Sequence, residues 1–109
     1  MSYLPIIVMT TVGTVEDARR IASELIENRL AACVNIIDGV TSLYRWQGKV
    51  MEDREWILLI KSIASRQDEL KEALYSLHPY EVPEFVVIDP SFVASPYREW
   101  LVTASKEDA

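Results

Sequence analysis

Apolar and polar positions along this chain predict strands and helices in a clear order, beginning with a buried strand. Residues 4–12 form a continuous apolar, β-branched run that ends at Gly13, which is typical of a strand buried on both faces. Thr14 has the position of a helix N-cap, and apolar side chains then follow at helical spacing: Ala18, Ile21, Ala22, Leu25 and Ile26. The pattern predicts an amphipathic helix that packs on a sheet.

A long hairpin is expected next. Residues 30–46 are strand-like, with a bulge or bend expected at Asp38-Gly39, and residues 47–48 fit a two-residue turn before residues 49–61 return as a second strand. Each arm of about 14 residues, at about 3.3 Å per residue, would run about 45 Å. A chain of this length has a body only about 35 Å across, so the hairpin tip must project beyond it.

The projecting hairpin predicts self-association. It carries Tyr44, Trp46 and Val50, and it would leave apolar surface and unpaired strand edges in water, which soluble monomers avoid. We therefore expect a homo-oligomer in which the arms pair with, or pack on, a neighbour. The alternative is a hairpin that bends at residues 38–39 and curls over its own sheet.

The remaining pattern completes the fold. Ser65 is a candidate N-cap for a second helix, which has apolar residues at helical spacing and ends before Pro79. Residues 85–88 are expected to form the fourth strand. Ser95 and the following proline predict the start of a short final helix, and residues 105–109 are expected to be a frayed tail. The order βαββαβ plus a helix is the α+β, ferredoxin-like sandwich, in one domain over residues 1–109.

Charge and cysteine content narrow the partners. Seventeen acidic and 11 basic residues give a net charge of −6, and the basic residues are scattered, so nucleic acid is a poor partner. Cys33 is the only cysteine and cannot form a disulfide within the chain, which favours a reducing cytoplasm. No long apolar span or secretory segment is present in the sequence, so no membrane partner is expected.

Candidate chemistry concentrates in residues 78–84, which hold the only histidine, two prolines and two carboxylates. His78 could bind a divalent metal together with Glu81 or Glu84, with further donors from symmetry-related subunits. The alternative is a hydrogen-bonded histidine that ends the second helix. For Cys33, packing in the core is favoured over metal ligation.

A ligand cleft between subunits is a second candidate site. Tyr44, Trp46 and Tyr80 could line it, although aromatic residues on strands often simply fill interfaces. Lys61 ends a buried strand and must reach water, pair with a carboxylate such as Glu84, or meet an anionic ligand, and we favour the ion pair. No catalytic combination of residues stands out, so an enzyme is not expected.

Four ordered motifs resemble the CutA divalent-cation tolerance family, and the resemblance covers almost the whole length of the chain. They are LAACVN (30–35), SLYRWQGK (42–49), the strand end at 60–61 and HPYEVPE (78–84). The resemblance implies a cytoplasmic homotrimer built through the long hairpins, similar in architecture to the nitrogen-regulatory PII proteins, with a role in tolerance of copper and other divalent ions.

The resemblance also implies which residues meet the metal. Copper binding has been proposed for some members through cysteine and histidine ligands, including the histidine that His78 matches. Thr10 stands here where some members have a cysteine, and Leu77 where some have a second histidine. We therefore expect Cu²⁺ or another divalent cation to bind weakly, with no tightly held cofactor. The alternatives are a PII-like module that binds an anionic small molecule through Lys61, and a trimer without a ligand.

Overall fold

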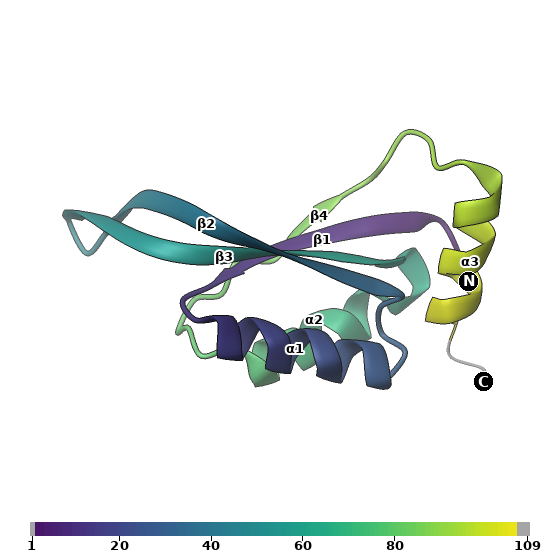
Figure 1. Cartoon of the computed structure of the whole chain (residues 1–109), viewed down its shortest axis with the longest axis horizontal. Coiled ribbons are helices and arrows are strands. Elements are labelled where there is room, and N and C mark those ends of the chain that lie inside the picture. Colours follow the sequence, from purple (N-terminus) through teal and green to yellow (C-terminus); the bar gives the residue numbers. More distant parts are fainter. Residues whose placement is uncertain (1, 107–109) are drawn as a thin grey trace.

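The computed structural model describes residues 2–106, which fold into an α+β sandwich (Figure 1). The order of elements agrees with the βαββαβ prediction, with an added C-terminal helix. The elements are β1 (Pro5–Val12), α1 (Val15–Glu27), β2 (Cys33–Trp46), β3 (Lys49–Ile63), the 3-10 turn η1 (Ala64–Arg66), α2 (Gln67–Leu77), β4 (Val86–Ile88) and α3 (Ser95–Ser105).

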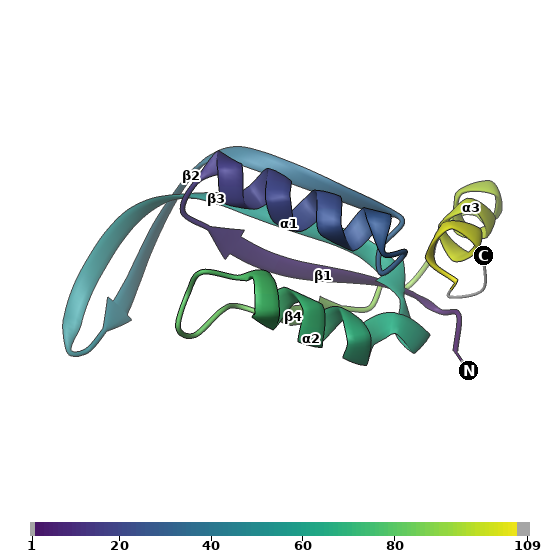
Figure 2. The same ribbon diagram turned by 90° about the horizontal axis from the view of Figure 1, so that it is seen from below.

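The sheet has the strand order β2-β3-β1-β4, and each neighbouring pair is antiparallel. The helices α1 and α2 lie side by side on one face, while α3 stands at one end of the sheet (Figures 1 and 2). This is the ferredoxin-like arrangement expected from the element order. None of the helices within residues 2–106 has the length and apolar character needed to cross a membrane.

The core lies between this sheet and the two helices. Along β1 every second residue is buried, so Ile6 and Val8 face the helices while Ile7 and Met9 face the other way. Core side chains from the helices and β3 complete the packing: Ala18, Ile21, Leu25, Leu58, Ile60, Leu70 and Leu74.

The opposite face of the sheet is also apolar but has no helix over most of its area (Figure 1). Strand alternation and register place Ile7, Met9 and Leu59 on this face, and Ile37 and Ile88 are each 41% exposed. We call it the open face. An uncovered apolar face of this kind is typical of an interaction surface.

The hairpin of β2 and β3 extends well beyond the other strands. Strand β1 ends where Val12 pairs with Trp56 of β3. Beyond this point, residues 40–46 of β2 and residues 49–55 of β3 pair only with each other. The described chain has a longest dimension of 44 Å, and the hairpin bends away from the rest of the sheet (Figure 2). The projecting hairpin is confirmed.

Glycines shape this hairpin as expected. The register of β2 shifts between Ile37 and Val40, where Gly39 has a φ of 75°, so one extra residue is accommodated in a bulge. At the tip, Gln47 and Gly48 both have positive φ, 48° and 79°, as a two-residue hairpin turn requires. Both features follow the sequence prediction.

Helix starts and ends agree with the sequence less closely. Thr14 caps α1 through a 3.1 Å hydrogen bond from the Asp17 amide, as predicted. The prediction that Ser65 caps α2 is wrong, because Ser65 lies within η1 and α2 begins after Arg66 without a side-chain cap. Ser95 is the first residue of α3, whose N-cap is Ala94.

The end of the chain also differs from the expected frayed tail. Ser105 is the last residue of α3 and is fully buried. Residues 107–109 of the predicted tail lie outside the described residues.

Candidate functional site

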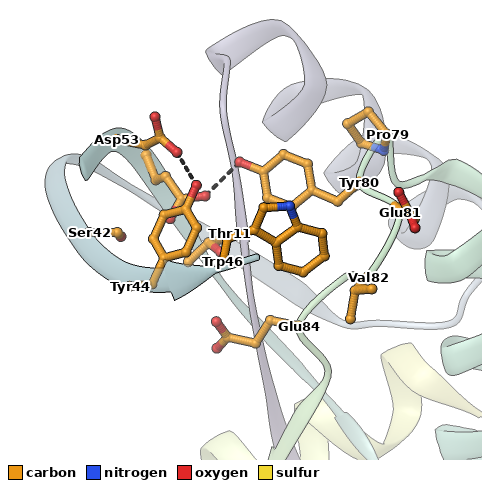
Figure 3. Close-up of a pocket in the computed structure, with 11 residues that line it drawn as sticks. Thr11, Ser42, Tyr44, Trp46, Asp53, Pro79, Tyr80, Glu81, Val82 and Glu84 are labelled. Atoms are coloured by element: carbon orange, nitrogen blue, oxygen red, sulfur yellow. Dashed lines mark hydrogen bonds between the residues drawn. The ribbon is translucent and has the colours of Figure 1, made fainter. Parts of the chain in front are cut away.

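A pocket of about 630 Å³ lies between the bent hairpin and the segment that follows α2 (Figure 3). The hairpin contributes side chains from both of its strands, β1 contributes Thr11, and the loop over residues 79–84 forms the opposite wall. The pocket therefore exists because the projecting hairpin and the proline-containing loop approach each other at the end of β1.

His78 fixes the start of this loop. It is 7% exposed, its Nε2 atom lies 2.8 Å from the Thr11 carbonyl oxygen, and its Nδ1 atom accepts a 3.1 Å hydrogen bond from the Tyr80 amide. Because Nδ1 accepts, Nε2 carries the proton and donates to Thr11. Both ring nitrogens are thus used in attaching the end of α2 to β1.

This environment disfavours a charged imidazole. Burial lowers the pKa of His78, against the smaller opposing effects of the Thr11 carbonyl and the carboxylates of Asp17 and Glu55. A neutral ring with one donor and one acceptor fits the two backbone partners. Metal binding through either nitrogen would require one of these hydrogen bonds to break.

Tyr80 connects the loop to β3 from inside the pocket. Its hydroxyl donates a 2.5 Å hydrogen bond to Oε2 of Glu55, which is only 7% exposed (Figure 3). A Cβ atom at Gly13 would lie 3.3 Å from this hydroxyl oxygen, so the glycine leaves room for it. Burial first, and then the hydrogen bond to Glu55, raise the pKa of Tyr80 well above its usual value.

The pocket is strongly acidic. Asp53, Glu55, Glu81 and Glu84 line it, and among the described residues no Lys, Arg or His side chain does. Burial raises the pKa of Glu84, and repulsion from Glu55 adds to the effect. Asp53 accepts a hydrogen bond from the Tyr44 hydroxyl, which raises the pKa of that tyrosine. The arrangement favours positively charged ligands.

Apolar side chains form the rest of the wall. The indole of Trp46 comes from the hairpin and points toward Tyr80 and Val82 of the loop, and Pro79 lies beside Tyr80 (Figure 3). Within residues 2–106, no group of three or more His, Cys, Asp or Glu side chains is close enough to hold a metal ion. The carboxylates are therefore distributed around the pocket and do not converge on one point.

The structure brings together five of the eight site residues that the sequence predicts. Tyr44, Trp46 and Tyr80 from the predicted cleft line the same pocket as Glu81 and Glu84 from the predicted metal site. The two sites that the sequence treats separately are thus one pocket within a single chain.

His78, Lys61 and Cys33 do not line it. The Lys61 ammonium lies 5.7 Å from the centre of the Tyr97 ring, and within residues 2–106 it forms no ion pair with Glu84, so that predicted pair is wrong. Lys61 pairs in register with Cys33, far along the strands from the pocket. A role for Lys61 in a cleft between subunits stays a prediction.

Cys33 is not a core residue, contrary to expectation. It is half-buried on the open face, and its Sγ atom lies 4.0 Å from Oδ1 of Asn35. Four rungs separate the Cys33 row of the sheet from the row that contains Thr11, or about 13 Å along the strands. Within one chain, Cys33 therefore cannot join the carboxylates of the pocket as a ligand.

Glu55 is the important residue that the sequence pattern did not reveal. It lies among charged residues that are typical of a solvated hairpin surface, yet it is buried beneath Tyr80. One signal was available: Glu55 directly precedes the apolar end of β3, which begins at Trp56. Thr11 and Ser42 also line the pocket without having been singled out. Asp53 lines it too, on the charged hairpin surface where an acidic ion-binding patch is the less favoured interpretation of the sequence.

Comparison with known proteins gives a consistent result. The model of the family described as CutA1 divalent ion tolerance protein matches residues 6–104. The divalent-cation tolerance protein CutA of Thermus thermophilus is 50% identical over 95 residues, which cover 87% of this chain and 92% of the relative. Protein CutA of Homo sapiens is 42% identical over 84% of this chain, but this chain spans only 52% of the human protein.

Solved structures agree over nearly the whole chain. The CutA1 structure from Oryza sativa has a TM-score of 0.93 at 38% identity and covers 98% of each chain. The structure of the Thermus thermophilus divalent cation tolerance protein has a TM-score of 0.91 at 46% identity, over 94% of this chain and all of the other. With its sequence motifs, fold and relatives in agreement, this chain belongs to the CutA1 divalent ion tolerance protein family.

Proposed function

We propose that this chain acts in the cytoplasm as a homotrimer in divalent-ion tolerance and binds Cu²⁺ or another divalent cation weakly. The observation that carries the cation-binding part is the acidic pocket, whose described lining includes four carboxylates and no basic residue. Oxygen donors from carboxylates suit divalent cations, and a negative pocket raises their local concentration. The cytoplasmic part rests on the single cysteine and on the family's role.

Within the pocket, Glu81 and Glu84 are the proposed ligands. Because one chain provides no group of three close donors within residues 2–106, binding by one chain would be weak, and further donors would come from a neighbouring subunit. His78 takes part only if it gives up a hydrogen bond to Thr11 or Tyr80, which costs about 1–3 kcal/mol. Such a cost corresponds to roughly 5- to 150-fold in affinity.

Calorimetric titration of Cu²⁺ tests this assignment. We expect the double variant Glu81→Gln/Glu84→Gln to bind at least several-fold more weakly than wild type. The variant Glu72→Gln removes the same kind of charge from an exposed position on α2, outside the pocket, and serves as the control. Equal affinity in the double variant and wild type would exclude the two carboxylates as ligands.

The trimer proposal rests on the open face and the projecting hairpin. Leu59 and Ile37 are apolar side chains on a sheet face that has no helix over most of its area. The hairpin residues 40–46 and 49–55 have no third strand beside them in a single chain. Light scattering should give three chains per particle for wild type. Leu59→Glu places a charge in this face and should give monomers, whereas a monomeric wild type at micromolar concentration would contradict the proposal.

A second candidate function is a PII-like small-molecule-binding module. The size of the pocket favours it, because about 630 Å³ lies within the usual range of small-molecule sites. Lys61 could still meet an anionic ligand in a cleft between subunits. A thermal-shift screen with anionic metabolites, in wild type and Lys61→Ala, tests this: stabilisation that the variant loses would support an anionic ligand.

A further inference from the structure

We propose that the pocket between the hairpin and residues 79–84 binds a linear aliphatic polyamine, an organic cation with ammonium groups separated by methylene chains. The proposal goes beyond divalent-ion tolerance and trimer formation, neither of which assumes an organic ligand. It depends on a buried carboxylate, on the distribution of charge around the pocket, and on the apolar wall between the charges.

The buried carboxylate is that of Glu55. Its side chain lines the pocket and is only 7% exposed. Within residues 2–106, the one side-chain hydrogen bond to this group comes from Tyr80 to Oε2, nothing donates to Oε1, and no basic side chain pairs with it. Oε1 is not among the fully buried atoms, so it stays accessible from the pocket, where a carboxylate with little surrounding water gains from a positive partner. A cation in the pocket would supply that partner.

The distribution of charge favours a ligand with several positive centres. Asp53, Glu55, Glu81 and Glu84 together carry up to four negative charges, and no basic residue in the described part of the lining offsets them. Yet no three of the described acidic, cysteine or histidine side chains are close enough to hold one metal ion. A single small ion reaches only donors within about 2.6 Å of its centre. Ammonium groups on a chain can each meet a different carboxylate.

The walls suit the methylene segments of such a ligand. Trp46 from the hairpin and Val82 from the loop both line the pocket, and the rings of Tyr44 and Tyr80 add aromatic surface (Figure 3). Ammonium groups are attracted to aromatic faces, and methylene chains gain from contact with apolar side chains. A volume of about 630 Å³ accommodates an extended molecule of this kind.

Isothermal titration calorimetry with spermidine tests the proposal on the full chain in its native oligomeric state. The central variant is Glu55→Gln, which removes the charge but keeps an oxygen that can accept the Tyr80 hydrogen bond. We expect about tenfold or greater loss of spermidine affinity, as removal of a charged hydrogen-bond partner commonly gives. Glu72→Gln, exposed on α2, should bind like wild type.

Two further titrations test the ligand class. Butylamine, with one ammonium group, should bind much more weakly than spermidine. Mg²⁺ at the same concentration should displace spermidine poorly, because a small ion cannot meet the separated carboxylates together. Equal binding of Mg²⁺ and spermidine would indicate a general counter-ion effect and would overturn the proposal.

Other results would also overturn it. Unchanged spermidine affinity in Glu55→Gln would remove the buried carboxylate from the site, and no binding to wild type would mean that a neighbouring chain or nothing occupies the pocket. If Glu55→Gln fails to fold, Glu84→Gln replaces it, with an expected loss of several-fold. Repeating the Cu²⁺ titration on the same variants separates the two proposals, because either ligand can be lost while the other is retained.

Discussion

Replacing His78 with alanine tests whether this residue is chiefly a structural attachment. The change leaves the Thr11 carbonyl and the Tyr80 amide without the partners that now lie at 2.8 and 3.1 Å. Each lost partner costs about 1–3 kcal/mol when the remaining group stays buried, and loss of ring packing adds to this. We expect His78→Ala to lower the free energy of unfolding by about 2–4 kcal/mol at neutral pH.

The size of this effect should depend on pH. Since burial lowers the folded-state pKa of His78 below 6.5, the unfolded chain takes up a proton first as pH falls. Wild-type stability is therefore fully present above pH 6.5 and declines below it, down to the folded-state pKa. His78→Ala lacks this contribution, so the difference between the two proteins should become smaller near pH 5.

Urea unfolding followed by tryptophan fluorescence, at one protein concentration, measures both effects. Ser76→Ala, an exposed substitution near the end of α2, is the control and should change stability by less than about 0.5 kcal/mol. A loss below about 1 kcal/mol in His78→Ala, or a difference that grows toward acid, would refute the reasoning. The small loss would mean that the two hydrogen bonds of the ring contribute little to stability, and the second result would contradict the lowered pKa of His78.

Three other changes have defined outcomes. Tyr80→Phe removes the hydrogen-bond donor to buried Glu55 and should lower the free energy of unfolding by about 1–3 kcal/mol at neutral pH. Because the folded-state pKa of Tyr80 is raised, wild type should lose stability above about pH 10, and the variant should lose less. Urea unfolding at several pH values measures both effects. Glu84→Gln should stabilise the protein at neutral pH, because the raised pKa of Glu84 means that its charge is unfavourable in the folded state. Thermal unfolding should show this gain in stability disappearing below about pH 4.5. A gain that persists in acid would contradict the prediction. Gly48→Ala should lower the free energy of unfolding by about 1–2 kcal/mol in the same urea assay. The backbone φ of 79° disfavours alanine, although no atom lies within 4 Å of the added Cβ. An unchanged urea midpoint would argue against a backbone effect.

Local signals in the sequence were enough for most of the fold. Apolar periodicity located the sheet and both packed helices, and Gly39 and Gly48 marked the bulge and the turn because only local backbone geometry is involved. Ser65 failed as a helix cap because the chain enters α2 through a 3-10 turn, which the capping pattern does not distinguish from a helix start.

The pocket was less accessible to sequence reasoning. Aromatic residues and carboxylates could be recognised as candidates, but the contact between Tyr80 and Glu55 joins residues 25 positions apart. It depends on how far the hairpin bends and on the path of the loop after α2, neither of which has a local signal. A free cysteine in an apolar strand is usually buried, which predicts a core position for Cys33, but the face of β2 that carries Cys33 is open.

The bulge at Gly39 has a consequence for how this pocket can change. Because β2 advances three residues between Ile37 and Val40 while β3 advances two, deleting Gly39 would restore regular pairing and keep Val40 opposite Glu55. The identities of the lining side chains would remain, while the bend that brings Trp46 toward the loop would relax. Removing a single codon would therefore change the shape of the pocket while its lining residues stayed the same.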